Sequence, residues 1–327
     1  RVRMGKIGRK RGKGMIQIFK TDEGVVRQTD EIEMNSWIAL TDPTAAEILE
    51  IADAFQIESD HLRAPLDEEE RSRLEIEDNY SLVLVDIPSI EERNGKDWYV
   101  TIPIGIIMTS TNIITVCLEE TPVLNAFMDG RVRDFHTYMK TRFILQVLYK
   151  NASLYLQYLR VIEKKSEVIE KKLHKSQKNQ ELIELLELEK SLLYFTTSLR
   201  SNEVVLEKLM RSERIKKYPE DTELLEDVII ENKQAIEMAN IYSGILGGTM
   251  DTFASVISNN QNLVMKFLTT VTIVMSIPTM ISSFYGMNVN SRGMPFAASP
   301  YGFQIIIGCS VVICLIIAWI FSKKDLF

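Results

Sequence analysis

Two long runs of apolar residues stand out in the C-terminal part of the chain. The first extends from Phe267 to Gly286 and the second from Tyr301 to Phe321, and a short segment that opens with Tyr285-Gly286-Met287-Asn288 joins them. Each run holds about 20 residues without a charged side chain, which is the length that an α-helix needs to cross roughly 30 Å of hydrocarbon. The pattern therefore predicts two transmembrane helices.

Polar side chains recur within the first apolar run at helical spacing. Five hydroxyl residues follow one another at steps of three and four, which places them on one face of a helix. We call them the hydroxyl stripe: Thr269, Thr272, Ser276, Thr279 and Ser283. The same spacing leads back through Met265, Asn262, Ser258 and Ser255 to Asp251, and forward to Gly286 and Asn290. This polar face favours a helix that lines water, and close packing between helices through small residues is the alternative.

The charges divide the chain into an acidic body and a membrane tail. The formal net charge is −7, and every acidic residue except Asp325 lies at or before Asp251. Lys266 precedes the first apolar run and Lys323-Lys324 follow the second, whereas the connecting segment holds only Arg292. The excess of positive charge on the cytoplasmic side of membrane proteins then predicts an integral cell (inner) membrane protein with both ends in the cytoplasm.

The sequence offers no sign of an enzyme. It contains no glycine-rich phosphate loop, nucleophile elbow or HExxH pair, and we interpret His61, His136 and His174 as ordinary surface or packing residues. Cys117, Cys309 and Cys314 form neither a disulfide framework nor a CxxC site, so we expect them to be small buried apolar residues. The basic run at residues 1–14 is followed by no apolar signal segment, and we favour an expression remnant or a disordered arm over a nucleic-acid site.

Residues 15 to about 133 have mixed α/β character. Short runs rich in β-branched and aromatic residues predict strands at Ile16–Phe19, Trp37–Leu40, Tyr80–Ile87, Trp98–Met108 and Asn112–Leu118. Asp42-Pro43 predicts the N-cap and first position of a helix that reaches Phe55. Asn94-Gly95 predicts a hairpin turn, Pro122–Met128 a short helix, and the charged segment Asp67–Asp78 a solvated loop or helix.

From about Phe135 onward the apolar spacing is helical. Phe143–Lys178 and Gln180–Arg214 predict two long helices joined by a short polar segment, which is typical of an antiparallel hairpin. Tyr218-Pro219-Glu220-Asp221 then supplies an N-cap, and one helix is predicted from about Asp221 through Gly286. Glycines at 244, 247 and 248 weaken this helix locally, so they indicate either a close helix approach or a kink.

The segment MKFLTTVTIVMSIPTMISSFYGMN resembles the signature of the CorA family of divalent-cation channels, whose first transmembrane helix ends in Gly-Met-Asn. The resemblance implies an α+β cytoplasmic domain (an αβα sandwich), a long helical stalk and two C-terminal transmembrane helices in a funnel-shaped homopentamer. It assigns residues 15–134 to the cytoplasmic domain and 135–218 to a helical hairpin. Residues 219–286 would form the stalk and first transmembrane helix, and 287–300 an extracellular loop. Residues 301–322 would form the second transmembrane helix and 323–327 a cytoplasmic tail.

The resemblance also implies roles for individual residues. Gly286, Met287 and Asn288 match the family's extracellular selectivity filter, and Asp251 matches an acidic residue of a regulatory divalent site between subunits. Asn262, Thr272 and Thr279 match pore-lining positions, and Met265 with Leu268 matches an apolar constriction. Together with the rest of the hydroxyl stripe, Thr269, Ser276 and Ser283, these residues would line the pore. A glycine at position 286 would also permit a tight turn at the helix end.

The expected function is potential-driven influx of hydrated Mg²⁺, gated by cytosolic Mg²⁺, with Co²⁺ and Ni²⁺ as passengers. The expected partners are copies of the same chain, membrane lipid and divalent cations, and no nucleic acid. A Zn²⁺, Co²⁺ or Ni²⁺ transporter on the same fold and a non-conducting membrane-tethered scaffold or sensor are the alternatives. Three features depart from the family pattern: Met294-Pro295-Phe296-Ala297 beside Arg292, in place of an acidic loop; Ser276, in place of an apolar residue; and the ending Asp325-Leu326-Phe327.

Overall fold

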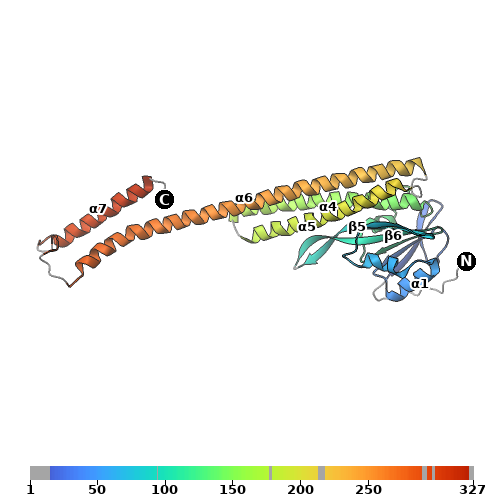
Figure 1. Cartoon of the computed structure of the whole chain (residues 1–327), viewed down its shortest axis with the longest axis horizontal. Helices are drawn as coiled ribbons and strands as arrows, with labels where there is room; N and C mark the ends of the chain where they lie inside the picture. The colour runs from blue at the N-terminus through green and yellow to red at the C-terminus, as the bar shows by residue number, and fades with distance from the viewer. Residues whose placement is uncertain are drawn as a thin grey trace. The chain divides into compact units, whose positions relative to one another are not determined.

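The computed structural model describes residues 15–93, 95–176, 179–212, 218–288, 293–296 and 299–323 (Figure 1). The chain divides into two compact units, Arg1–Thr249 and Met250–Phe327. Asn94, Asn290, Arg292, Ala297 and residues 324–327 therefore lie outside the described part of the chain.

A seven-stranded sheet organises the first unit. Its strand order is β2-β1-β3-β7-β6-β5-β4, and within the described sheet β3 and β7 pair parallel while the other neighbours pair antiparallel. The strands are β1 (Met15–Asp22), β2 (Val25–Thr29), β3 (Trp37–Thr41), β4 (Arg73–Ile76), β5 (Tyr80–Arg93), β6 (Lys96–Thr109) and β7 (Ile113–Cys117). Arg93 pairs with Lys96 at the tip of the β5–β6 hairpin, so the predicted hairpin is present.

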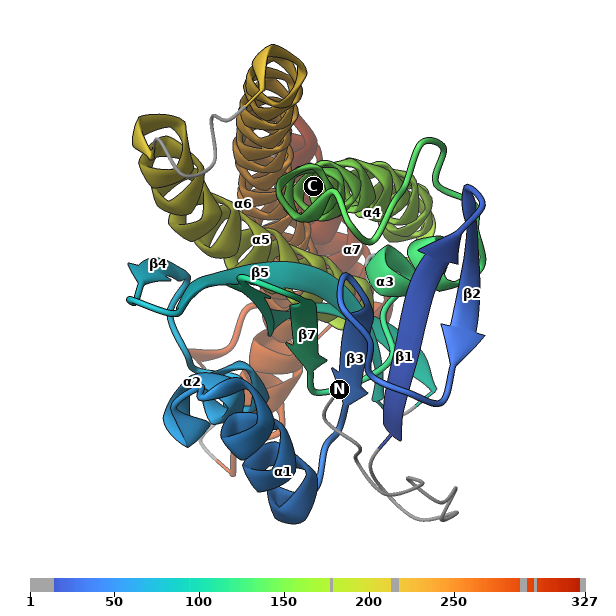
Figure 2. The ribbon, with the colours of Figure 1, turned by 90° about the vertical axis from the view of Figure 1, so that its right-hand side faces the viewer.

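Helices cover both faces of the sheet, and Figure 2 shows α1 and α2 on one side with α4 and α5 on the other. The first side carries α1 (Ala45–Phe55), α2 (Ser59–Arg63) and the 3₁₀ turn η1 (Ala64–Leu66). The second carries α3 (Pro122–Met128), α4 (Lys140–Ser176), α5 (Asn179–Arg211) and the beginning of α6 (Pro219–Tyr285). Separate apolar cores fill the two sides, which confirms the predicted αβα sandwich.

Trp37 is the centre of the larger core. It is fully buried, its ring stacks on Phe19 at 4.9 Å between centroids, and Phe127, Phe135 and Phe143 meet its edges. Its indole nitrogen donates to Thr115 Oγ1 at 2.9 Å, so the one polar atom of this large side chain is satisfied. The core therefore ties β1 and β3 to α3 and α4.

Three local predictions require correction, and one strand was not predicted. Thr44, not Asp42, caps α1, because the Thr44 hydroxyl accepts from Glu47 N while the Glu47 carboxylate accepts from Thr44 N. The helix predicted from about Asp221 begins at Pro219, and Asp221 accepts from Arg142 Nε at 3.1 Å. The segment Asp67–Asp78 contains strand β4, and β2 was not predicted.

The second unit contains the last part of α6 and the helix α7 (Gly302–Lys323). Both helices are long and apolar enough to cross a membrane. Within α6, the partly or fully covered residues after Phe267 are Thr270, Val274, Ile277, Pro278, Ile281 and Tyr285, which share one helix face. The Cys314 thiol of α7 contacts the Val274 carbonyl on this face at 3.6 Å. The face is thus the side of α6 that α7 covers.

Neither the glycines nor a proline interrupts α6. The glycines at 244, 247 and 248 lie within the continuous helix, so the prediction of one helix through this region is confirmed. Pro278 also lies inside the helix, and since proline has no N–H, the carbonyl of Val274 one turn earlier loses its usual partner. The Cys314 thiol supplies a donor to that carbonyl. Cys314 therefore has a polar role, Cys117 is buried as predicted, and Cys309 is exposed in the single chain.

Candidate functional site

The hydroxyl stripe lies on the side of α6 that faces away from α7. Val274, which Cys314 contacts, and Ser283 of the stripe are nine residues apart, or about two and a half turns, and therefore point in opposite directions. All five hydroxyl residues are exposed in the single chain, as are the predicted pore-lining residues Asn262, Met265 and Leu268. The structure thus gathers the predicted pore-lining residues on one uncovered face.

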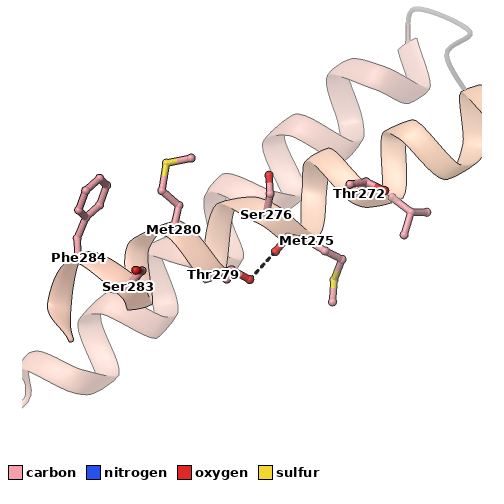
Figure 3. Close-up of a pocket in the computed structure, with 8 residues that line it drawn as sticks. Thr272, Met275, Ser276, Thr279, Met280, Ser283 and Phe284 are labelled. Carbon is pink, nitrogen blue, oxygen red and sulfur yellow. Dashed lines mark hydrogen bonds between the residues drawn. The ribbon is translucent and has the colours of Figure 1, made fainter. Parts of the chain in front are cut away.

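Four hydroxyl groups of the stripe donate to the backbone of their own helix. Thr269, Thr272 and Thr279 donate to carbonyls four residues back at 2.8 to 3.0 Å, and Ser276 donates to Ile273 O at 2.8 Å. Figure 3 draws the bond from Thr279 to Met275. Because a hydroxyl has one hydrogen and two lone pairs, these four oxygens are left as acceptors toward the outside.

An open hollow of about 670 Å³ follows the stripe. Apolar side chains that the sequence analysis did not single out flank the hydroxyls, and Figure 3 shows them alongside. The residues that line the hollow are Val271, Thr272, Met275, Ser276, Thr279, Met280, Ser283 and Phe284. One helix can supply only one wall, so an enclosed path along this face would need walls from further helices.

The Gly-Met-Asn segment directly follows the end of α6. Gly286 N donates to Ser282 O at 3.0 Å and to Ser283 O at 3.2 Å, and Met287 N donates to Phe284 O at 3.4 Å, so the chain closes the last turn before it leaves the helix. Gly286, Met287 and Asn288 are all exposed. Tyr285 OH donates to Pro295 O at 2.8 Å, which ties the helix end to the segment that precedes α7.

A side chain at position 286 would meet little resistance. Gly286 does not adopt a positive φ, and a Cβ placed there would lie 3.4 Å from Ser282 O, which is ordinary contact. The backbone at this position therefore does not itself require glycine in the single chain.

At the other end of the stripe, Asp251 is an exposed acidic residue of α6. Its backbone carbonyl accepts from the Ser255 hydroxyl at 3.0 Å. Between Asp251 and the stripe, Met265 and Leu268 expose 61% and 52% of their surface, so these apolar side chains also lie on the uncovered face. Lys266 lies within α6 just before its apolar part, and Lys323 is the last residue of α7. Lys323 Nζ lies 5.2 Å from the Trp319 ring centroid.

Comparisons with known proteins agree with this architecture. Residues 33–324 match the family described as "CorA-like Mg2+ transporter protein". The cobalt/magnesium transport protein CorA of Methanocaldococcus jannaschii is 28% identical over 323 residues, which span 95% of this chain and 98% of the relative. The complete structure of the CorA magnesium transporter from the same organism superposes with a TM-score of 0.83 at 26% identity, covering 96% of this chain and 99% of that one.

A more distant structure shares the fold. The full-length CmaX protein superposes with a TM-score of 0.70 at 14% identity and covers 97% of this chain and 99% of its own. The family match spans both the sandwich and the two apolar helices, and the first relative matches almost from end to end. This chain therefore belongs to the CorA-like Mg²⁺ transporter family, whose members are divalent-cation transporters and not enzymes.

Proposed function

We propose that the chain forms a Mg²⁺ channel in which several copies of α6 surround a path for hydrated ions. The observation that carries the proposal is the position of the hydroxyl stripe on the exposed side of α6, opposite the face that α7 covers. Because one such face cannot enclose a path, the proposal requires an oligomer. The resemblance to the family makes that oligomer a funnel-shaped homopentamer around the first transmembrane helix.

The chemistry of the stripe suits a hydrated ion. Mg²⁺ gives up its water reluctantly, and the bound water molecules point their hydrogens outward. The stripe oxygens that have already donated to the backbone are acceptors and can receive these hydrogens. The stripe contains no histidine, cysteine or carboxylate that would bind a transition metal tightly. Co²⁺ and Ni²⁺, which are also octahedral when hydrated, would pass as competitors.

The Gly-Met-Asn segment at the outer end of α6 would act as the selectivity filter. An amide oxygen on Asn288 can accept from the hydration shell without displacing it, and a ring of such side chains would recognise the size of the hydrated ion. Gly286 and Met287 would place this ring at the end of the helix. Influx needs no nucleotide, since a divalent ion moving inward gains about 2 × 2.3, or 4.6, kcal/mol per 100 mV of membrane potential.

Regulation is assigned to the inner end of the same helix. Asp251 would bind cytosolic Mg²⁺ between neighbouring subunits and hold the pore closed, whereas at low Mg²⁺ the like charges would repel and loosen the assembly. Met265 and Leu268 would form the constriction that closes by excluding water. Lys266 and Lys323 support an inner-membrane orientation with both chain ends in the cytoplasm, because cations concentrate on that side.

Ion flux into proteoliposomes tests the proposal. The purified chain should admit Mg²⁺ when the inside is negative, and the rate should fall when Mg²⁺ is added inside. Co²⁺ and Ni²⁺ outside should compete with Mg²⁺, whereas Zn²⁺ transport that Mg²⁺ does not affect would favour the alternative transporter. A symmetric oligomer that conducts no divalent ion under any internal condition would favour the scaffold or sensor.

A further inference from the structure

Three potential metal ligands meet on the first unit, far along the chain from the hydroxyl stripe. One ligand atom each from His61, Glu75 and Glu77 lies within 4.8 Å of the other two. His61 belongs to α2, Glu75 to the edge strand β4, and Glu77 directly follows that strand. The group joins segments that are separated by more than ten residues, so it depends on the fold.

The sheet register explains why the two glutamates share a side. Residues two apart in a strand point to the same face. Glu77 follows β4 directly, and its N–H donates to Tyr80 O at 2.9 Å, so the pairing with β5 continues to Glu77 and places it beside Glu75. Glu75 lies opposite Leu82 of β5, and Leu82 belongs to the core beneath α1 and α2. Both carboxylates therefore lie on the side of the sheet that α2 covers. All three ligand residues are partly buried, and the side chains of His61 and Glu75 expose only 13% and 29% of their surface.

A contact with Tyr80 holds the imidazole of His61 through its Nδ1 atom. His61 Nδ1 lies 2.7 Å from Tyr80 OH, and that oxygen also accepts from Glu58 N at 3.3 Å. This contact directs Nε2 toward the carboxylates, and Nε2 lies 2.8 Å from Glu75 Oε2. A metal-binding histidine is typically oriented in this way by a hydrogen bond to its second nitrogen.

We propose that His61 Nε2, Glu75 and Glu77 bind one divalent transition-metal ion, with Zn²⁺ and Co²⁺ as the best candidates. One imidazole nitrogen and two carboxylate oxygens form a ligand set that these ions accept, with water in the remaining position. Ligand atoms around a tetrahedral Zn²⁺ lie about 3.3 Å apart at metal–ligand distances of about 2.0 Å. The three ligand atoms lie within 4.8 Å of one another. Small rotations of the side chains can therefore bring them to the separation that the ion requires.

The same ligand set discriminates against Mg²⁺. That ion prefers six oxygen ligands and retains several water molecules, so an imidazole nitrogen is a poor exchange for water. The site therefore differs in chemistry from the carboxylate assigned to regulation at Asp251. An ion bound here would tie α2 to the edge strand of the sheet.

The competing explanation is a plain ion pair between His61 and Glu75. Glu75 also accepts from Arg73 Nε through its other oxygen, and Arg73 contacts Glu70 as well. An ion pair of this kind needs only Glu75, whereas a metal site needs Glu77 too. The variant Glu77→Gln separates the two explanations, because it leaves the His61–Glu75 contact in place and removes one ligand.

The experiment titrates the full chain in detergent, after chelator treatment, with Zn²⁺ alone or Co²⁺ alone. Calorimetry measures the affinity, and the visible absorption of Co²⁺ reports its ligands. Glu69→Gln is the matched control, since it makes the same change at an exposed residue of the same segment. The titrations are repeated on Asp251→Asn so that this carboxylate contributes nothing, and circular dichroism checks that each variant is folded.

We expect one ion per chain at this site, with the Co²⁺ spectrum unchanged by Glu69→Gln and by Asp251→Asn. His61→Ala and Glu77→Gln should each weaken binding by more than the roughly 10- to 100-fold that loss of an outer-shell partner costs, and excess Mg²⁺ should not displace the ion. Binding that is absent from the Asp251→Asn chain, or that folded Glu77→Gln retains in full, would overturn the proposal.

Discussion

The thiol of Cys314 on α7 donates to the carbonyl oxygen of Val274 on α6 at 3.6 Å. That carbonyl would accept the backbone N–H of residue 278 in an ordinary helix, but residue 278 is proline. In hydrocarbon no water replaces a missing donor. The contact between the two helices therefore compensates for a defect in the backbone of one of them.

Cys314→Ala should accordingly destabilise the folded chain, whereas Cys314→Ser should restore or improve its stability. Hydrogen bonds between membrane helices contribute about 0.6 kcal/mol on average, and a thiol is a weak donor, so the expected loss is below about 1 kcal/mol. Thermal unfolding in detergent measures it. Cys309→Ala, at an exposed position of the same helix, is the control, and equal effects of the two alanine variants would contradict the explanation.

Thr279→Val should reduce Mg²⁺ flux without disturbing assembly. Valine has the shape of threonine but no oxygen, so the stripe loses one acceptor in every copy. A hydrogen bond is worth about 1 kcal/mol, which corresponds to roughly a fivefold change in rate for one contact. Flux into proteoliposomes measures the effect. Thr270→Val makes the same change on the side that α7 covers, and a larger loss of flux there would contradict the assignment of the stripe.

Asn288→Ala should abolish Mg²⁺ uptake while leaving the oligomer intact. The amide oxygen is the proposed acceptor for the hydration shell, and alanine offers none. Uptake is measured together with size-exclusion chromatography of the same preparation. Asn259→Ala, on the exposed surface of α6 before the apolar run, serves for comparison. Undiminished uptake by the Asn288 variant would remove this residue from the filter.

Asp251→Ala should weaken the inhibition of uptake by internal Mg²⁺. The variant loses the carboxylate proposed to bind the ion, so the internal concentration needed for half inhibition should rise at least tenfold, which corresponds to about 1.4 kcal/mol of lost binding. Asp227→Ala tests the same charge change at another exposed position of α6. An unchanged dose dependence in the Asp251 variant would exclude this residue from the sensor.

Asp86 predicts a pH dependence of stability in the first unit. Burial raises the pKa of its carboxyl group, and the hydroxyls of Ser198 and Ser72 offset this only in part. Since the folded pKa exceeds the unfolded one, the contribution of this group is fully present below the unfolded pKa and is lost as pH rises through the folded pKa. Asp86→Asn should therefore gain stability relative to the parent chain from acid to neutral pH.

Thermal unfolding between about pH 4 and pH 7 measures this difference, because an ordinary aspartate titrates near the lower limit. Asp53→Asn makes the same change at an exposed residue of α1. A stability difference between Asp86→Asn and the parent that does not vary with pH would show that the raised pKa has no effect on folding.

The sequence predicted most reliably the elements whose pattern is dictated by burial. A run without charges and a stripe of hydroxyls at helical spacing were sufficient to place the end of α6 and the face of its polar residues. The buried strands β3, β5, β6 and β7 were found because β-branched residues crowd them. In each case the residues of the element share one environment, apolar or polar, and this environment determines the residue types.

The two strands that were missed, β2 and β4, are the two edges of the sheet. Edge strands are short and carry charged side chains, which protects them from pairing with other chains and also removes the alternating pattern. The error had a consequence for the candidate metal site. Glu75 lies in β4 and Glu77 directly follows it, and this extended segment brings both carboxylates beside His61. The N-cap at Thr44 depends on the paired hydrogen bonds with Glu47, which the preceding Asp42-Pro43 obscured.

The backbone bonds of Thr269, Thr272, Ser276 and Thr279 also bear on the sign of the charge that this face tolerates. A chloride ion binds to hydrogen-bond donors. The hydrogens of these four hydroxyl groups are already donated to backbone carbonyls of α6. A face of this kind would disfavour anions although it bears no formal charge. This effect would persist at high salt, where the field of a ring of charged residues is screened.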